Sequence, residues 1–335
     1  MNKVYSLILL TFLSGNALAV AGSPEPTENI LLFAQTDQDT SCEQPKEYLI
    51  DIEKTRVRYV EAGAGPAVVM IHGNAGSVDD FDFKSLGQLC RDHRLIAFDR
   101  PGHGKSHRPN GSDARLKDQT RLLHETLSHL GITRPILVGH SWGGALALDY
   151  ALQYPNEVSA IVLLAPAAYP DGSGDEFMRG MLKTPVVGDV TLTLGRLILG
   201  KRLLKKELAK AFYPEDVPDD YLRHASSLWL GHKQVRAFLE DEWSLDKDLE
   251  KTSRHYADIR IPVVIVTGDH DKVVSAKHNA YRLKISIAQS QLIELKNTGH
   301  QVPQTHPESI NKALSLISKF SPRSQSSGVS NPRLR

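Results

Sequence analysis

The sequence predicts an α/β fold: a mostly parallel central sheet with helices on both faces and a helical cap insertion. Three observations predict it. Near-continuous apolar runs of strand length recur along the chain, segments with helical spacing separate them, and about ninety residues of helical character interrupt the alternation once. The predicted strands are residues 47–52, 56–60, 67–71, 94–98, 135–138, 160–164, 262–267 and 291–295.

Helical spacing is clearest between the fourth and fifth predicted strands. Apolar residues with helical spacing occur there at Leu116, Leu122, Leu123, Leu127 and Leu130, and Gly131 follows as a stop signal. A second helical run, residues 145–154, begins directly after the fifth strand. Strand, helix and strand in repetition favour parallel strands with helices packed on both sides.

Changes in composition divide the chain into segments. Residues 1–19 resemble a signal peptide, because Lys3 precedes a short apolar run that ends in small residues at Ala19. We therefore expect a periplasmic or secreted protein, the alternative being an uncleaved membrane anchor. Residues 20–45 are expected to be flexible, 46–167 and 259–320 to form the core, 168–258 the helical cap or lid, and 321–335 a disordered tail.

Charge and cysteine content exclude some classes of protein. The 335 residues carry 40 basic and 39 acidic side chains, a balance that argues against nucleic acid as a partner. Cys42 and Cys90 are too few for a disulfide scaffold or a structural zinc site. The two cysteines either form one disulfide with each other or remain as free thiols. The sequence contains no metal-binding helix motif and calls for no cofactor.

The segment Gly139-His140-Ser141-Trp142-Gly143 carries the strongest chemical signal. It has the Gly-x-Ser-x-Gly pattern, preceded by a predicted strand and followed by a predicted helix. Such a sharp turn strains the serine backbone and presents its hydroxyl at the carboxyl edge of the sheet. Ser141 is therefore the predicted nucleophile, and the amide of Trp142, at the helix N-terminus, is a predicted oxyanion donor.

This elbow resembles that of the α/β-hydrolase superfamily, and other segments extend the resemblance over roughly residues 47–320. The sequence His72-Gly73-Asn74 is similar to the loop that supplies the second oxyanion donor in the family, which implies the backbone amide of Asn74. Residues 98–106 resemble the family's turn after the fourth strand, a structural signature to which no chemistry is assigned.

The resemblance also implies the other two members of a catalytic triad. Residues 266–274 look like the family's acid site, which selects Asp271 over Asp269, and Gly299-His300 looks like the loop of the catalytic base. The chain order Ser141, Asp271, His300 is the order that this fold requires. The remaining histidines, including His72 and His140, are interpreted as packing or hydrogen-bonding residues.

The pattern as a whole implies a serine hydrolase of the esterase or lipase type. Carbon–carbon bond hydrolases, peroxidase-like enzymes and aminopeptidases share the same triad, and a non-catalytic ligand-binding protein on this fold is an alternative of another class. A serine at the elbow disfavours dehalogenase and epoxide hydrolase activity, because family members resembling those enzymes carry an aspartate at this position.

The predicted cap gives the only information on substrate and partners. Apolar residues are dense over 186–204, and Trp229, Phe238 and Trp243 follow. They either line a pocket for a small, apolar ester or pack the cap onto the core. Basic residues at positions 201, 202, 205 and 206 favour either contact with a membrane surface or an ordinary solvated face.

Overall fold

A computed structural model describes residues 44–109, 114–172 and 187–320, with only the backbone described over 187–199. An eight-stranded sheet forms its centre, in the order β1-β2-β4-β3-β5-β6-β7-β8. Strand β2 is antiparallel to both of its neighbours, and all other pairs are parallel. The strands are β1 (Lys46–Ile52), β2 (Thr55–Ala62), β3 (Ala67–Ile71), β4 (Arg94–Phe98), β5 (Ile136–His140), β6 (Ala160–Leu164), β7 (Val263–Gly268) and β8 (Gln291–Leu295).

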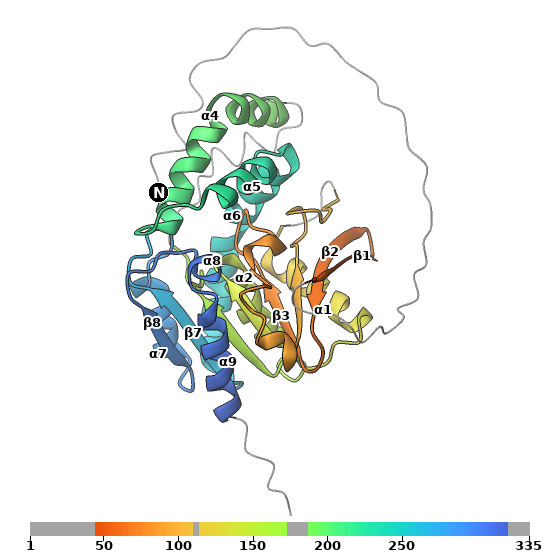
Figure 1. Cartoon of the computed structure of the whole chain (residues 1–335), viewed down its shortest axis with the longest axis vertical. Coiled ribbons are helices and arrows are strands. Elements are labelled where there is room, and N and C mark those ends of the chain that lie inside the picture. The colour runs from red at the N-terminus through yellow and green to blue at the C-terminus, as the bar shows by residue number, and fades with distance from the viewer. Residues whose placement is uncertain (1–43, 110–113, 173–186, 321–335) are drawn as a thin grey trace, which may run out of the picture.

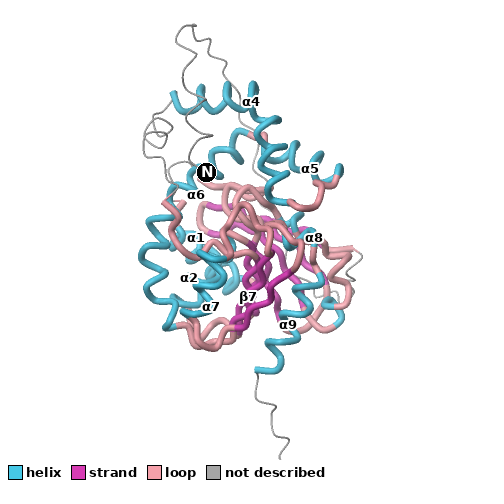
Figure 2. The backbone as a smooth tube through the Cα atoms, turned by 90° about the vertical axis from the view of Figure 1, so that its left-hand side faces the viewer, coloured by secondary structure: helices cyan, strands magenta, loops and turns pink. Residues whose placement is uncertain are grey.

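Helices cover the two faces of this sheet. Figure 2 shows α1 (Leu116–His129), α2 (Trp142–Gln153) and α7 (Arg282–Ser286) on one side of the strands and α9 (Glu308–Phe320) on the other. Shorter elements complete the core, namely η2 (Val78–Asp80), η3 (Leu89–Arg91), η5 (Lys277–Tyr281) and α8 (Val302–Thr305). None of the helices in the described ranges has the length and apolar character needed to cross a membrane.

The predicted fold class is confirmed, and all eight predicted strands occur with ends within two residues of those expected. The largest differences are at the ends of β2 and β5. Strand β2 continues to Ala62 because that residue still pairs with Leu95 of β4. Strand β5 continues to His140, which pairs with Leu164 of β6, so the strand runs directly into the nucleophile elbow.

The apolar core lies in two layers, one on each face of the sheet. Successive residues of one strand contribute to opposite layers, as the pleat requires. Leu137 of β5 packs with α1 and α2, whereas Val138 packs with the layer under α9. Cys90 belongs to this second layer and is disulfide-bonded. Cys42 lies outside the described residues, as do the predicted signal peptide, residues 20–43 and the tail 321–335.

The segment between β6 and β7 supplies the cap. It contains α4 (Val187–Phe212), α5 (Asp219–Trp229), α6 (His232–Thr252) and η4 (Ser253–Asp258), and Figure 1 shows α4 and α5 standing clear of the sheet. Leu204 and Phe212 are buried in a separate apolar cluster of α4 and α5, against which Trp229 packs. Leu204, Phe212 and Trp229 therefore pack within the cap.

Candidate active site

Ser141 lies on the turn from β5 to α2 in a strained backbone conformation, with φ 51° and ψ −114°. The turn is so tight that its glycines have no room for a side chain. A methyl group on Gly143 would lie 2.3 Å from the carbonyl oxygen of Ile71, and one on Gly139 would lie 2.3 Å from the carbonyl oxygen of Gly143. The elbow therefore needs glycine at both positions, and it sits against the end of β3.

Asp271 and His300 come from the loops after β7 and β8 and are joined by a hydrogen bond. The ring Nδ1 of His300 donates to Oδ2 of Asp271 over 2.8 Å. The other carboxylate oxygen accepts from the amides of Val273 and Val274, each at 2.8 Å. Burial alone would raise the pKa of Asp271, but His300 and these two amides hold it below its ordinary value. The carboxylate is therefore ionised at neutral pH and fixes the tautomer of His300.

His140 links the elbow of Ser141 to the loop of His300. Its Nε2 donates to the carbonyl oxygen of His300 over 2.9 Å, and the centroids of the two rings are 4.9 Å apart. In the part of the chain that the structure describes, no hydrogen bond joins the hydroxyl of Ser141 to the ring of His300. Apo active sites often leave this contact unformed until substrate binds. The predicted acid and base are thus paired, and the predicted nucleophile directly follows His140, whose ring lies next to that of His300.

The loop after β3 approaches Ser141 at Gly73. A methyl group on Gly73 would lie 3.1 Å from Cβ of Ser141, so the backbone of this loop touches the elbow. The next residue, Asn74, is fastened to the cap, because its side-chain amide donates to the carbonyl oxygen of Phe238 and to Glu242, each over 3.0 Å. The backbone amide of Asn74 follows Gly73 in this loop, and that of Trp142 follows Ser141 in the first turn of α2.

The other candidate residues have structural partners. Asp269 pairs with His270 at 2.6 Å, and it is Asp271 that contacts His300. His103 is fully buried and donates to Asp241 over 2.8 Å. Burial lowers the pKa of His103 to about 4 and that of His140 to about 3, so both rings are neutral. Within the described ranges no three His, Cys, Asp or Glu side chains are placed to hold a metal ion.

A buried ionic cluster between core and cap escaped the sequence analysis. Arg100, in the turn after β4, donates to Asp241 of α6 over 2.6 Å, and Arg108 also pairs with this carboxylate. Burial raises the pKa of the neighbouring Glu242 to about 7. The only sequence signal is the run Glu240-Asp241-Glu242, which reads as a solvated helix face. Its central carboxylate is fully buried.

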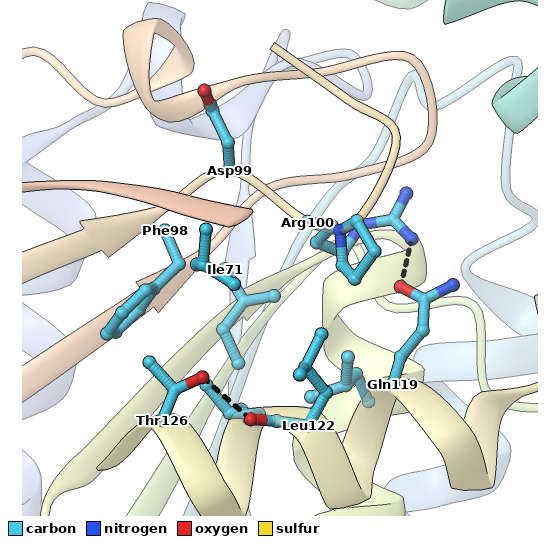
Figure 3. A pocket seen from close by; sticks show the side chains of 11 residues that line it. Ile71, Phe98, Asp99, Arg100, Gln119, Leu122 and Thr126 are labelled. Carbon is cyan, nitrogen blue, oxygen red and sulfur yellow. Dashed lines mark hydrogen bonds between the residues drawn. The ribbon is translucent and has the colours of Figure 1, made fainter. Parts of the chain in front are cut away.

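A small apolar cavity lies beside Arg100, between α1 and the sheet (Figure 3). Ile71, Phe98 and Leu122 form part of its wall, and Gln119 accepts a hydrogen bond from Arg100 at 3.0 Å. Ser141 is not among the lining residues. The cavity therefore lies beside the ionic cluster and does not include the predicted nucleophile.

Comparison with known proteins agrees with the fold. A family model described as the alpha/beta hydrolase fold matches residues 66–307. Lipase 1 of Psychrobacter immobilis is 26% identical over 290 residues, which are 85% of this chain and 85% of the relative. The 2-hydroxy-6-oxo-2,4-heptadienoate hydrolase of Pseudomonas putida is 27% identical over 244 residues, 72% of this chain and 85% of the relative. A solved alpha/beta hydrolase fold protein from Burkholderia ambifaria is similar with a TM-score of 0.69 and 25% identity, covering 80% of this chain and 96% of the other.

Proposed function

The chain belongs to the α/β-hydrolase fold family and is a hydrolase, and from this premise we propose that it is an exported serine hydrolase that cleaves a carboxylic ester or related acyl bond. The observation that carries the proposal is the hydrogen bond of 2.8 Å between Asp271 and His300, in loops that adjoin the strained elbow of Ser141. A buried, ionised carboxylate on Nδ1 leaves Nε2 of the imidazole as the base.

The first half-reaction forms an acyl-enzyme. Oγ of Ser141 bonds to the ester carbonyl carbon while its proton passes to Nε2 of His300, and the carbonyl electron pair moves onto oxygen. The amides of Asn74 and Trp142 donate to this oxyanion. When the tetrahedral intermediate collapses, the bond to the alcohol oxygen breaks and His300 returns its proton to that oxygen. Asp271 stabilises the imidazolium that exists in between.

The second half-reaction releases the acid. His300 takes a proton from water as the water oxygen bonds to the acyl carbon, and the same two amides hold the second oxyanion. Collapse of this intermediate breaks the bond to Oγ of Ser141, which recovers its proton from His300. Atoms and charges balance with water as the only co-substrate, and no cofactor enters the cycle.

A small, apolar ester is the proposed substrate class. Two related proteins bear on the choice between an ester and the carbon–carbon bond alternative. One is named a lipase, and the other is named a 2-hydroxy-6-oxo-2,4-heptadienoate hydrolase. Phe238 and Trp243, on cap helix α6, are only partly buried. A panel of aryl and acyl esters of graded length, with an amide, a lactone and a vinylogous diketone, separates the ester reading from the carbon–carbon alternative.

Export is part of the proposal, and the disulfide at Cys90 supports it. Disulfides persist in oxidising compartments such as the bacterial periplasm. Fractionation of cells expressing the full chain tests this: activity in the periplasm or medium, on a chain shortened at the N-terminus, is the expected result. Activity retained in the cytosolic fraction on a full-length chain contradicts it.

Contact of the cap with a membrane surface is a separate proposal. Four exposed basic side chains on α4 support it, namely Lys201, Arg202, Lys205 and Lys206. Co-sedimentation with phosphatidylglycerol vesicles tests it, and binding should weaken when the four are replaced by glutamine or when salt is raised. Equal sedimentation of the variant and the parent protein overturns it.

A fluorophosphonate probe tests the enzyme reading directly, because it reacts only with an activated serine. We expect the parent protein to be labelled and Ser141→Ala not to be. Ser309→Ala is the matched control, because this buried hydroxyl of α9 has no hydrogen-bond partner and should not matter. Absence of labelling in the folded parent protein favours a non-catalytic ligand-binding protein instead.

A further inference from the structure

Arg100 has a buried guanidinium at the junction of core and cap. Its side chain is 2% exposed, and its partner Asp241 is fully buried on α6. Nη1 donates to Oδ2 of Asp241 over 2.6 Å and to Gln119 over 3.0 Å, and Figure 3 shows the guanidinium reaching over α1 to Gln119. These contacts fix the plane of the guanidinium.

The same guanidinium is hydrogen-bonded to the loop that carries a proposed oxyanion donor. Nη2 of Arg100 donates to the carbonyl oxygen of Gly73 over 3.1 Å. That oxygen accepts a second hydrogen bond, of 2.7 Å, from Nδ1 of His72. The tautomer of His72 is fixed by Arg100 as well, because the backbone amide of Arg100 donates to Nε2 of the ring over 2.9 Å.

The carbonyl of Gly73 and the amide of Asn74 belong to one planar, trans peptide group. Holding the carbonyl oxygen therefore sets the direction of the N–H on the opposite side of the plane. On the basis of the proposed function, we propose that Arg100, held by Asp241 of the cap, is a positioning residue that aims the Asn74 amide at the oxyanion. Arg100 acts through this peptide and does not touch the reacting atoms.

A second contact of Arg100 concerns the other oxyanion donor. The guanidinium carbon lies 4.0 Å from the centroid of the Trp142 ring, and the indole N–H of Trp142 donates to the carbonyl oxygen of Asp241 over 3.4 Å. The residue after the nucleophile is thus clamped between Arg100 and α6. Arg100 therefore contacts both residues whose backbone amides are the proposed oxyanion donors.

The ion pair is charged at neutral pH. Burial lowers the pKa of Arg100 to about 10, which still leaves the guanidinium protonated. Burial alone would raise the pKa of Asp241, but Arg108 and Arg100 hold it below its ordinary value. Removing either charge would leave the other buried without its full set of partners.

The test compares an ester with the corresponding thionoester in Arg100→Lys, with active sites counted by fluorophosphonate titration. Lysine keeps the charge but cannot contact Asp241, Gln119 and Gly73 at once, and it cannot stack on Trp142. We expect kcat for the ester to fall about tenfold to a hundredfold, with KM little changed, since loss of a whole donor costs roughly a hundredfold to a thousandfold. The thionoester should lose less, because sulfur is a poor acceptor, so the ester/thionoester ratio should fall.

Arg108→Lys is the matched control. Arg108 also binds Asp241, and its other side-chain contact is with Glu240, at 3.2 Å. The Arg108→Lys variant should leave the ester/thionoester ratio unchanged. An unchanged ratio in folded Arg100→Lys overturns the proposal, since a merely structural change lowers both rates equally. If Arg100→Lys does not fold, the ester/thionoester ratio of Asp241→Asn tests the proposal instead. Failure of the parent protein to hydrolyse either substrate would instead contradict the proposed function.

Discussion

The backbone amide of His300 donates to the carbonyl oxygen of Ala211 over 2.8 Å, and this oxygen also accepts from the next amide, that of Gln301, at 3.0 Å. Ala211 is in the last turn of α4, where helix carbonyls have no partner within the helix. The loop of the proposed base is therefore held by the cap, as the oxyanion loop is.

Gly299→Ala should lower both activity and stability. A methyl group at Gly299 would lie 2.1 Å from the carbonyl oxygen of Tyr213 and 2.8 Å from that of Ala211, so either α4 or the His300 loop must move. Overpacking of this kind costs about 1–3 kcal/mol in the free energy of unfolding. Denaturant unfolding and ester turnover measure the two effects. Gly87→Ala is the control, since its methyl group would meet one carbonyl oxygen at 3.2 Å. Turnover equal to that of the control would show that the base tolerates displacement of the loop.

Asp271→Asn should reduce kcat by roughly ten-thousandfold while folding is retained, because an amide no longer fixes the His300 tautomer or stabilises its cation. Asp269→Asn is the control. Its carboxylate contacts His270 and the amide of Thr298, and its loss should leave kcat nearly unchanged. Steady-state kinetics with circular dichroism checks both variants. The opposite ranking would assign the acid to Asp269.

Ser141→Gly should be more stable than Ser141→Ala by about 1 kcal/mol, although neither is active. At φ 51° a side chain is strained, and glycine relieves that strain at the cost of some chain entropy. Urea unfolding of the two variants under identical conditions gives the difference. Equal midpoints and slopes would mean that the elbow stores no backbone strain.

Asp80→Asn should flatten the dependence of stability on pH. Burial raises the pKa of Asp80 to about 7, although Tyr221 donates to its carboxylate over 2.9 Å. Between its ordinary pKa of about 3.9 and about 7, the folded protein holds a proton that the unfolded chain has lost. The free energy of unfolding therefore declines as pH rises through this window and levels off above it.

An asparagine at position 80 keeps an acceptor for Tyr221 and removes the titration. The unfolding free energy of the variant relative to the parent protein should accordingly increase from pH about 4 to about 7. Asp92→Asn, at an exposed carboxyl group, is the control and should follow the parent protein. Parallel curves for Asp80→Asn and the parent protein would place the pH dependence elsewhere.

Local patterns were sufficient to predict the strands and the elbow, because each depends on neighbouring residues, whereas the loops of Asp271 and His300 were indicated by the family resemblance. Contacts between the cap and the core were not predictable. Arg100 and Asp241 are 141 positions apart, and Asp241 lies between two other acids on a helix rich in charge. Periodicity indicates which face of a helix is polar, but it does not show that one carboxylate on that face is buried against an arginine.

The two anchors of the cap, at Ala211 and Asp241, limit how this scaffold can diversify. An unrelated insertion transplanted between β6 and β7 would restore turnover only if it also brought an acceptor for the amide of His300 and an acid for Arg100. New selectivity should therefore arise more readily from point substitutions elsewhere on the insertion than from exchange of the whole segment. The insertion thus supports the two core loops on which the proposed chemistry depends.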